Sequence, residues 1–442
     1  MRLSKCPGSM ARCIVSIGLG AMLPCISICS WAQTPNSGEK VVADSSPASA
    51  EPHNIAPSGN LLFLQRPQAE AQTQQGVTVW VAPLRAEESQ AAFGLPLAKR
   101  GVQPVWIRVE NRSGRAWRFM PVFLDRDYFS AHEVAWMFRG KAGVDAALLT
   151  QLSARAMPST IAPDTVASGF VYTNLTLGFK VVNVELVGDH AHLQFDFARE
   201  QPGGHFDFRS LNPAKLYPVH RLRAVGLAEL REALATMPCC ATDKTGLRQG
   251  DPLNLVVVGD ERSVLAALVR GGWDFTDALG ARSTERMVSA FVLRESYRNA
   301  PVSSLYFEGR AQDFAMQRSR STVSQRNHLR LWLTPLEFSG QPVWVGQISR
   351  DIGVRLTERS PTFTTHAIDP DVDEAREYLL QDLLRSGVVQ RYGMVGGVGA
   401  APVNAPRSNL TGDPYYTDGA RLVLFPSQQT VSLSEVEVLP WN

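Results

Sequence analysis

The segment "RNHLRLWL", residues 326 to 333, alternates between two kinds of side chain with a period of two. In a β-strand successive side chains point to opposite faces, so the three leucines and Asn327 share one face. The other face carries large side chains, most of them charged or titratable: Arg326, His328, Arg330 and Trp332. The leucine face predicts a core, and the second face must meet either solvent or a ligand.

A second strand is predicted at "SSLYFEGR", where Glu308 and Arg310 alternate with apolar residues. If the two strands are neighbours in one sheet, Glu308 lies beside Arg326 or Arg330. The polar face is then either solvated, with cross-strand ion pairs and an aromatic cover, or a set of donors that binds a phosphate or carboxylate. In the second case His328 exchanges a proton. The ligand-binding candidates are Arg310, Arg326, Arg330, Trp332 and Asp351.

The segment "TTHAIDPDVDEAREYL" combines a histidine with carboxylates at alternate positions. Asp369, Asp371 and Asp373 are ligand types for calcium or magnesium, although Glu374 and Leu380 stand where an EF-hand requires Gly and Glu. The competing interpretation is helix capping, with Asp369 as N-cap, Pro370 as the first helical residue and acidic groups complementing the helix dipole. Capping does not explain His366. The catalytic candidates are therefore His328, His366 and Asp369.

The first 32 residues predict a secretory signal. A basic start precedes an apolar run at 13–28, and Ser30 and Ala32 place small residues before the expected cleavage site. An uncleaved anchor is the alternative, but the run is short and interrupted. A lipoprotein site at Cys25 or Cys29 lacks the usual small-residue pattern. The expected location is periplasmic or secreted, and residues 33–58, rich in Pro, Ser and Ala, predict a disordered tether.

Charge and cysteine content limit the function classes. The chain has 44 Lys and Arg against 42 Asp and Glu, and the predicted signal removes three basic residues and no acidic one. A nearly neutral mature chain lacks the basic field of a nucleic-acid-binding protein. No later segment offers about 18 consecutive apolar residues, so we expect no integral membrane segment in the mature chain. The two remaining cysteines, Cys239 and Cys240, form either a vicinal disulfide or two partly buried thiols.

The element pattern predicts an α+β protein. Residues 59–205 contain short β-branched and aromatic runs typical of a β-sandwich-like domain, and "NRSG" at 111–114 predicts a hairpin turn. A helical insertion begins at the capping box of Ser130 and Glu133. Residues 206–225 form a proline-containing junction. Residues 226–442 combine helices, one of them capped by Asp260, with a buried strand "LNLVVVG", which favours an α+β domain with a mixed sheet.

Six motifs of the C-terminal half together resemble the LssY C-terminal domain family over about residues 220–420: "GDPLNLVVVGD", "GGWDFTDAL", "YRNAPVSSLYFEGRAQDFAMQR", "RNHLRLW", "QPVWVGQISRDIGV" and "THAIDPDVDEAREYLLQDL". In some members this domain is joined to membrane-embedded phosphatase-like or DedA-like segments. The resemblance therefore implies the bacterial envelope and handling of phospholipid or polyprenyl phosphate. Here the β-rich region replaces the membrane portion, and Asn327 and Ala367 stand where many members carry a second histidine.

Two functions follow as hypotheses. The first is an exported binding or accessory module whose C-terminal domain recognises an anionic small molecule, a lipid head group or an envelope protein. The second is a hydrolase of a phosphorylated lipid or glycan, in which arginines hold the anion and Asp369 or Asp371 orients a histidine or a divalent metal. No cofactor is certain. The hydrolase requires His328 and His366 to lie within about 10 Å of each other in a concave site.

Overall fold

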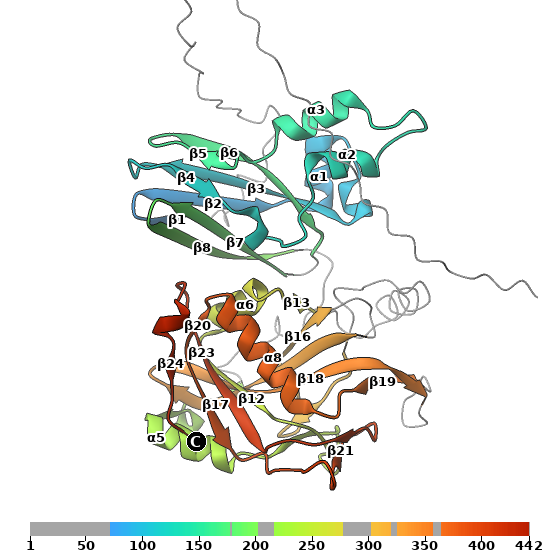
Figure 1. The fold of residues 1–442 in the computed structure, drawn as a ribbon, viewed down its shortest axis with the longest axis vertical. Coiled ribbons are helices and arrows are strands. Elements are labelled where there is room, and N and C mark those ends of the chain that lie inside the picture. The colour runs from blue at the N-terminus through green and yellow to red at the C-terminus, as the bar shows by residue number, and fades with distance from the viewer. Residues whose placement is uncertain are drawn as a thin grey trace, which may run out of the picture. The chain divides into compact units, whose positions relative to one another are not determined.

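A computed structural model describes residues 71–176, 179–201, 216–276, 302–319, 325–356 and 364–441. The predicted signal, the predicted tether and residues 206–215 of the predicted junction lie outside the described residues. The described helices and strands are partly segregated along the chain and the strands form several sheets (Figure 1). The predicted α+β class is confirmed.

Residues 71–201 contain two four-stranded sheets. The first has the order β1 (Ala71–Gln74), β2 (Val77–Pro83), β3 (Val102–Asn111) and β6 (Val166–Asn174). The second has the order β5 (Thr160–Ile161), β4 (Trp117–Phe119), β7 (Phe179–Gly188) and β8 (Ala191–Glu200). Their apolar faces share one core. The predicted hairpin turn at 111–114 is wrong, because β3 and β4 belong to different sheets.

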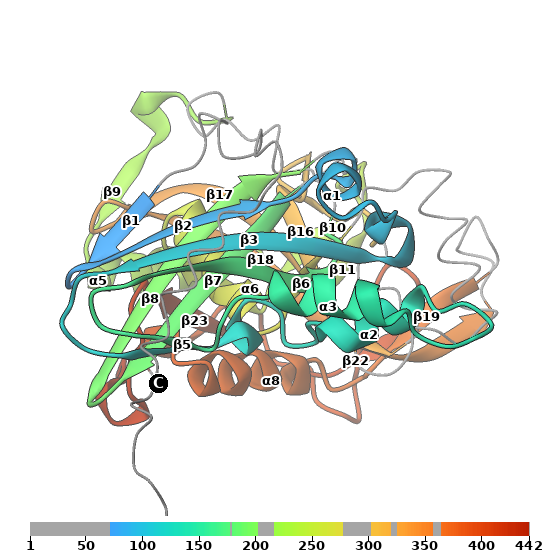
Figure 2. The ribbon, with the colours of Figure 1, turned by 90° about the horizontal axis from the view of Figure 1, so that it is seen from above.

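Three helices accompany these strands: α1 (Ala86–Phe93), α2 (Ala131–Met137) and α3 (Ala146–Ala154). The predicted capping box is confirmed, since the Glu133 backbone N–H donates to Ser130 Oγ at 3.1 Å and the Ser130 N–H donates to the Glu133 carboxylate at 2.7 Å. Figure 2 shows α2 and α3 side by side. They pack with α1 over aromatic residues of β3 and β6, including Trp106 and Phe170.

The C-terminal region is built on a ten-stranded mixed sheet. Its main path runs β13 (Asp274–Phe275), β16 (Phe314–Ser319), β17 (Arg326–Phe338), β18 (Gln341–Leu356), β12 (Leu255–Val258), β23 (Ala420–Pro426), β20 (Val389–Gly396) and β24 (Glu437–Val438). Strand β19 (Thr364–Ile368) pairs with β18, and β9 (Arg223–Val225) pairs with β17. The predicted "LNLVVVG" strand is confirmed as β12, which is buried throughout and parallel to β23.

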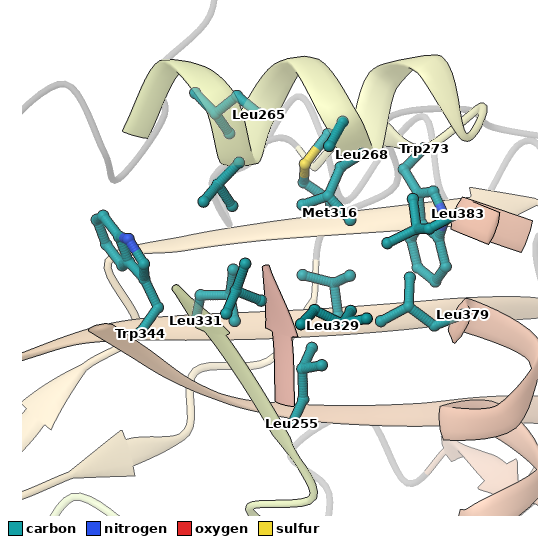
Figure 3. Packing of buried hydrophobic residues seen from close by; sticks show 14 of the residues in the cluster. Leu255, Leu265, Leu268, Trp273, Met316, Leu329, Leu331, Trp344, Leu379 and Leu383 are labelled. Atoms are coloured by element: carbon teal, nitrogen blue, oxygen red, sulfur yellow. The ribbon is translucent and has the colours of Figure 1, made fainter. Parts of the chain in front are cut away.

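One face of this sheet packs against α6 (Glu261–Arg270) and α8 (Val372–Arg385). Asp260 caps α6 as predicted, accepting the Ser263 backbone N–H at 3.0 Å. The leucines of the opening segment lie on this face and are buried, as the alternation predicts. Figure 3 shows side chains of the helices, of the strands and of the turn after α6 meeting in this core: Leu255, Leu265, Leu268, Trp273, Met316, Leu329, Leu331, Trp344, Leu379 and Leu383.

The start of α8 differs from the prediction. Asp371, and not Asp369, is the N-cap, and its side chain accepts the Asp373 backbone N–H at 3.2 Å. Pro370 therefore precedes the helix. The Asp369 backbone N–H donates to the Arg350 carbonyl at 2.8 Å, which extends the contact between β19 and β18 past the expected helix start.

The opposite face of the sheet is covered in part by α5 (Leu227–Thr236) and by a small sheet of order β11 (Gln249–Pro252), β10 (Cys240–Thr242), β14 (Tyr306–Phe307) and β15 (Arg310–Ala311). The condition that 305–310 and 326–333 are neighbours in one sheet is not met, because β14 and β15 belong to this separate sheet. Glu308 lies in their turn with a φ of 50° and is exposed. It does not reach the arginines of β17.

Cys239 and Cys240 form a disulfide between adjacent residues at the end of α5. The same helix end is held by Arg421, which is fully buried and donates to backbone carbonyls of Leu253 at 2.8 Å and Met237 at 3.0 Å, and also to those of Leu234 and Pro238. Burial lowers the pKa of Arg421 to about 10. Arg421 thus stabilises the backbone that leads into the disulfide.

Candidate functional site

The second face of β17 is buried, so the interpretation of it as a solvated surface is wrong. Six polar side chains from β17 and β18 lie there together, and we call them the polar cluster: Arg326, His328, Arg330, Gln347, Ser349 and Asp351. The antiparallel register places His328 opposite Ser349 and Arg330 opposite Gln347. Because alternate residues share a face, the pattern of the opening segment and the pattern of "QISRD" meet on one side of the sheet.

Hydrogen bonds connect four of these side chains into one chain. Arg330 Nη1 donates to Gln347 Oε1 at 2.7 Å, and Gln347 Nε2 donates to Ser349 Oγ at 2.8 Å. Since a guanidinium only donates, the amide oxygen of Gln347 must face Arg330 and its NH₂ group must face Ser349. Ser349 Oγ lies 3.0 Å from His328 Nε2.

At the other end of the chain, His328 Nδ1 lies 3.4 Å from Asp351 Oδ1. An ionised carboxylate only accepts, so a neutral His328 meets both neighbours when Nδ1 carries the hydrogen and Nε2 accepts from the Ser349 hydroxyl. Arg326 Nε holds the second Asp351 oxygen at 3.0 Å, and Arg326 also bonds Gln317 Oε1 at 2.5 Å. Serine, histidine and aspartate are thus connected in the order of a nucleophile, its base and an orienting carboxylate.

Arg330 has a different environment from Arg326. Among the described residues no carboxylate forms a direct ion pair with Arg330, whose Nε donates to the Ser303 carbonyl at 3.0 Å. Burial lowers its pKa to about 10, while the charges of Asp251 and Asp351 act in the opposite direction. Asp251 is itself buried, which raises the pKa of its carboxyl, and Asn409 Nδ2 donates to it at 3.2 Å.

Two of the predicted ligand-binding residues lie apart from this chain. Arg310 forms an ion pair with Asp313 and donates to the Leu333 carbonyl at 2.7 Å. Trp332 is fully buried in the apolar cluster under the small sheet, and its Nε1 donates to the Arg310 carbonyl at 3.1 Å. Arg326, Arg330 and Asp351 do come together, as neighbours of His328.

The predicted metal candidates lie at the start of α8. Asp369 accepts the Asp371 backbone N–H at 3.1 Å, and Asp373 accepts Thr417 Oγ1 at 2.8 Å and the Asp418 N–H at 2.7 Å. Burial raises the pKa of Asp373. Over the part of the chain that is described, no group of three or more histidine, cysteine, aspartate or glutamate side chains has the arrangement of a metal site. The metal at Asp369, Asp371 and Asp373 stays a prediction.

His366 lies in β19, opposite Val354 of β18, and its side chain is outside the described part. His328 pairs with Ser349 of the same β18. Five residues of strand separate these two backbone positions by about 16 Å. The joint action of the two histidines stays a prediction. Asn327, where a second histidine is expected from the resemblance, lies on the opposite face from His328 and accepts from Arg350 Nε at 3.1 Å.

Sequence reasoning missed Ser349, Gln347 and Asp251. The first two had a signal in the sequence. Gln347, Ser349 and Asp351 occupy alternate positions of one strand, as the polar residues of β17 do. Asp251 had no comparable signal, since it comes from β11 of the separate small sheet.

The C-terminal region thus combines helices and sheets, with a buried polar cluster on one face of its large sheet. Residues 233–420 match the family model described as LssY C-terminus, which confirms the resemblance seen in the sequence. The description names a domain and no activity. No curated protein matches the chain. No helix in the described residues is long and apolar enough to cross a membrane.

Proposed function

We propose that the C-terminal domain is a hydrolase that cleaves carboxylic esters, with Ser349 as nucleophile, His328 as general base and Asp351 as the orienting carboxylate. The observation that carries this proposal is the 3.0 Å contact between Ser349 Oγ and His328 Nε2, with His328 Nδ1 facing Asp351. A serine becomes nucleophilic when an adjacent base takes its proton and a third group orients that base. The envelope phospholipids implied by the family resemblance contain such ester bonds.

The steps of the reaction can be assigned to this arrangement. Ser349 Oγ attacks the ester carbonyl carbon while its proton moves to His328 Nε2, and Asp351 stabilises the imidazolium. The carbon–oxygen bond to the alcohol breaks, and the alcohol leaves with that proton. Water then attacks the acyl-serine, passes a proton to His328 and releases the acid, after which the proton returns to Ser349. Gln347 Nε2, 2.8 Å from Ser349 Oγ, is a side-chain N–H donor beside the developing oxyanion.

Access is the demanding requirement of this proposal. Ser349 is 1% exposed and His328 is 6% exposed. A substrate therefore reaches Ser349 and His328 only when the residues that bury them move. A covalent probe measures this accessibility and the nucleophilicity together.

The test is labelling of the mature chain with a fluorophosphonate that carries a fluorophore, followed by mass spectrometry of the labelled peptide. We expect labelling at Ser349, and no labelling of Ser349→Ala or His328→Ala. The matched control is Ser263→Ala, because Ser263 is also buried and its hydroxyl donates to the Asp260 carboxylate at 2.6 Å. This control should be labelled like the unaltered protein. Absence of label from the unaltered protein, or label that survives Ser349→Ala, refutes the hydrolase.

The second candidate is a binding module that recognises an anionic ligand without turnover. The burial of the serine favours it, as does the absence, among the residues that the structure describes, of a carboxylate paired directly with Arg330. Calorimetric titration with inorganic phosphate tests it. Binding that disappears in Arg330→Gln, in a protein that resists the fluorophosphonate, supports the module over the enzyme. A divalent metal is part of this proposal only if phosphate binding requires one.

The expected site of action is the periplasm or the exterior, and this rests on the N-terminal sequence alone. Mass spectrometry of the protein recovered from a periplasmic fraction tests it. We expect the mature chain to begin at Gln33. Recovery of the chain with residues 1–32 still attached contradicts cleavage after Ala32.

A further inference from the structure

We infer that Arg330 and Asp251 form a subsite for a carboxylate or phosphate group carried by the ester that the proposed hydrolase cleaves. The inference rests on the proposed function and adds the substrate class. Both residues are more than nine-tenths buried, at 5% and 8% exposure. They come from different sheets, β17 and β11, so their juxtaposition depends on the packing of the two layers.

The hydrogen bonds of Arg330 favour an anion. Its guanidinium donates to two neutral acceptors, the Ser303 carbonyl and the Gln347 amide, and no described carboxylate is close enough for an ion pair. A desolvated guanidinium without a directly bonded counter-ion binds carboxylate or phosphate strongly and can do so through two parallel bonds. The cluster also holds Arg326 and Asp351, whose charges cancel, so the charge of Arg330 remains.

Asp251 completes the subsite. One of its oxygens accepts from Asn409 Nδ2 at 3.2 Å. Burial raises its pKa, the nearby Asp413 and Asp351 carboxylates add to this effect, and Arg330 opposes it. A neutral carboxyl donates a hydrogen bond to an anion, whereas an ionised one repels it. The subsite should therefore bind anions better at lower pH.

The register fixes the distance from this subsite to the reacting serine. Arg330 and His328 are two residues apart on one strand face, which separates them by about 7 Å. Ser349 lies beside His328, as its partner in the neighbouring strand. An anionic group bound at Arg330 thus lies a few bonds from the carbonyl carbon that Ser349 attacks. A para-substituted phenyl acetate has a comparable separation between its ester and its second substituent.

The experiment compares kcat/KM of the mature chain for three acetate esters. 4-Acetoxybenzoate carries a carboxylate, 4-acetoxyphenyl phosphate carries a phosphate, and methyl 4-acetoxybenzoate is the neutral match. We expect at least one charged ester to be favoured about tenfold or more over the neutral one, and the charged pair separates carboxylate from phosphate as the preferred group. Arg330→Gln should bring this ratio close to one. The control Arg350→Gln, on the opposite sheet face, should leave the ratio unchanged.

Asp251→Asn distinguishes two roles of Asp251: a carboxyl that donates to the bound anion, and a carboxylate that only balances the charge of Arg330. The asparagine keeps a donor and removes the competing charge, so the preference for charged esters should persist and lose its pH dependence. If Asp251 is instead an ionised counter-ion of Arg330, Asp251→Asn removes the repelling charge, and the preference should rise well above that of the unaltered protein at every pH. If Arg330→Gln does not fold, Arg330→Lys keeps the charge, loses the planar fork and should reduce the ratio.

The outcomes distinguish this inference from the proposed function. Equal kcat/KM for all three esters overturns the subsite and leaves the hydrolase standing. Absence of turnover with every ester refutes the hydrolase. Calorimetric titration then shows whether the anion subsite exists. In that case binding of 4-hydroxybenzoate that is lost in Arg330→Gln keeps the anion subsite, and failure to bind overturns it.

Discussion

Asp351→Asn removes one negative charge from the polar cluster with almost no change of shape. The side chains of Asp351 and Arg326 are 1% and 4% exposed, and 3.0 Å separates Arg326 Nε from Asp351 Oδ2. Removing one partner of a buried pair costs about 3–5 kcal/mol, because the other charge stays buried. Arg326 keeps its bond to Gln317, so we expect the lower end, about 3 kcal/mol of the free energy of unfolding.

Urea unfolding followed by tryptophan fluorescence measures this change. The matched control is Asp189→Asn, since Asp189 is 93% exposed and lies 3.5 Å from an exposed His190. That control should change stability by less than about 0.5 kcal/mol. A loss below about 1 kcal/mol in Asp351→Asn would refute the buried ion pair as an energetic feature. In the hydrolase the same change disturbs the histidine tautomer and should lower kcat by up to about 10⁴-fold.

Three further predictions concern the core, the disulfide and pH. Leu329→Ala opens a cavity beneath α6 and α8 and should lower the free energy of unfolding in urea by about 3–5 kcal/mol. The control Leu247→Ala, at a leucine that is 86% exposed, should lower it by less than about 0.5 kcal/mol. Replacing Cys239 and Cys240 by Ala should lower the free energy of unfolding by only about 1 kcal/mol, because a disulfide between adjacent residues closes almost no loop. Thiol titration of the unaltered protein verifies that the disulfide is present. Burial raises the folded-state pKa of Asp251, so the native state holds its proton longer than the unfolded state does. The contribution of Asp251 to the free energy of unfolding therefore falls as pH rises from about 4 through the raised pKa. Asp251→Asn should remove this pH dependence of the free energy of unfolding, measured between about pH 4 and 7.

Local patterns predicted the elements of the C-terminal sheet. The period of two in 326–333, the continuous apolar run of β12 and the Asp260 cap each depend on a few neighbouring residues. The start of α8 depends on more than its own residues. Asp369 satisfies every local rule for an N-cap, but its N–H is bonded to Arg350 across the sheet, and this tertiary contact moves the cap to Asp371.

The candidate site was predictable only in part for the same reason. The polar face of β17 follows from alternation, which names Arg326, His328 and Arg330. The partner strand and its register do not follow, and a shift of one residue would present Ile348 or Arg350 to His328 in place of Ser349. Asp251 required knowledge of how a second sheet packs.

The apolar face of the sheet fixes that register and so holds the proposed nucleophile against its base. Gly346 of β18 lies opposite Leu331, and a Cβ at this position would come within 2.4 Å of Leu331 Cδ2 and 2.9 Å of the Arg330 carbonyl oxygen. Only glycine allows the two strands to meet there with Leu331 in the core. Because residues 346 and 349 share one strand, the pairing of Gly346 with Leu331 also brings Ser349 to His328 on the other face. The contact that carries the proposed function is therefore a consequence of core packing, which explains why residue type alone could not reveal it.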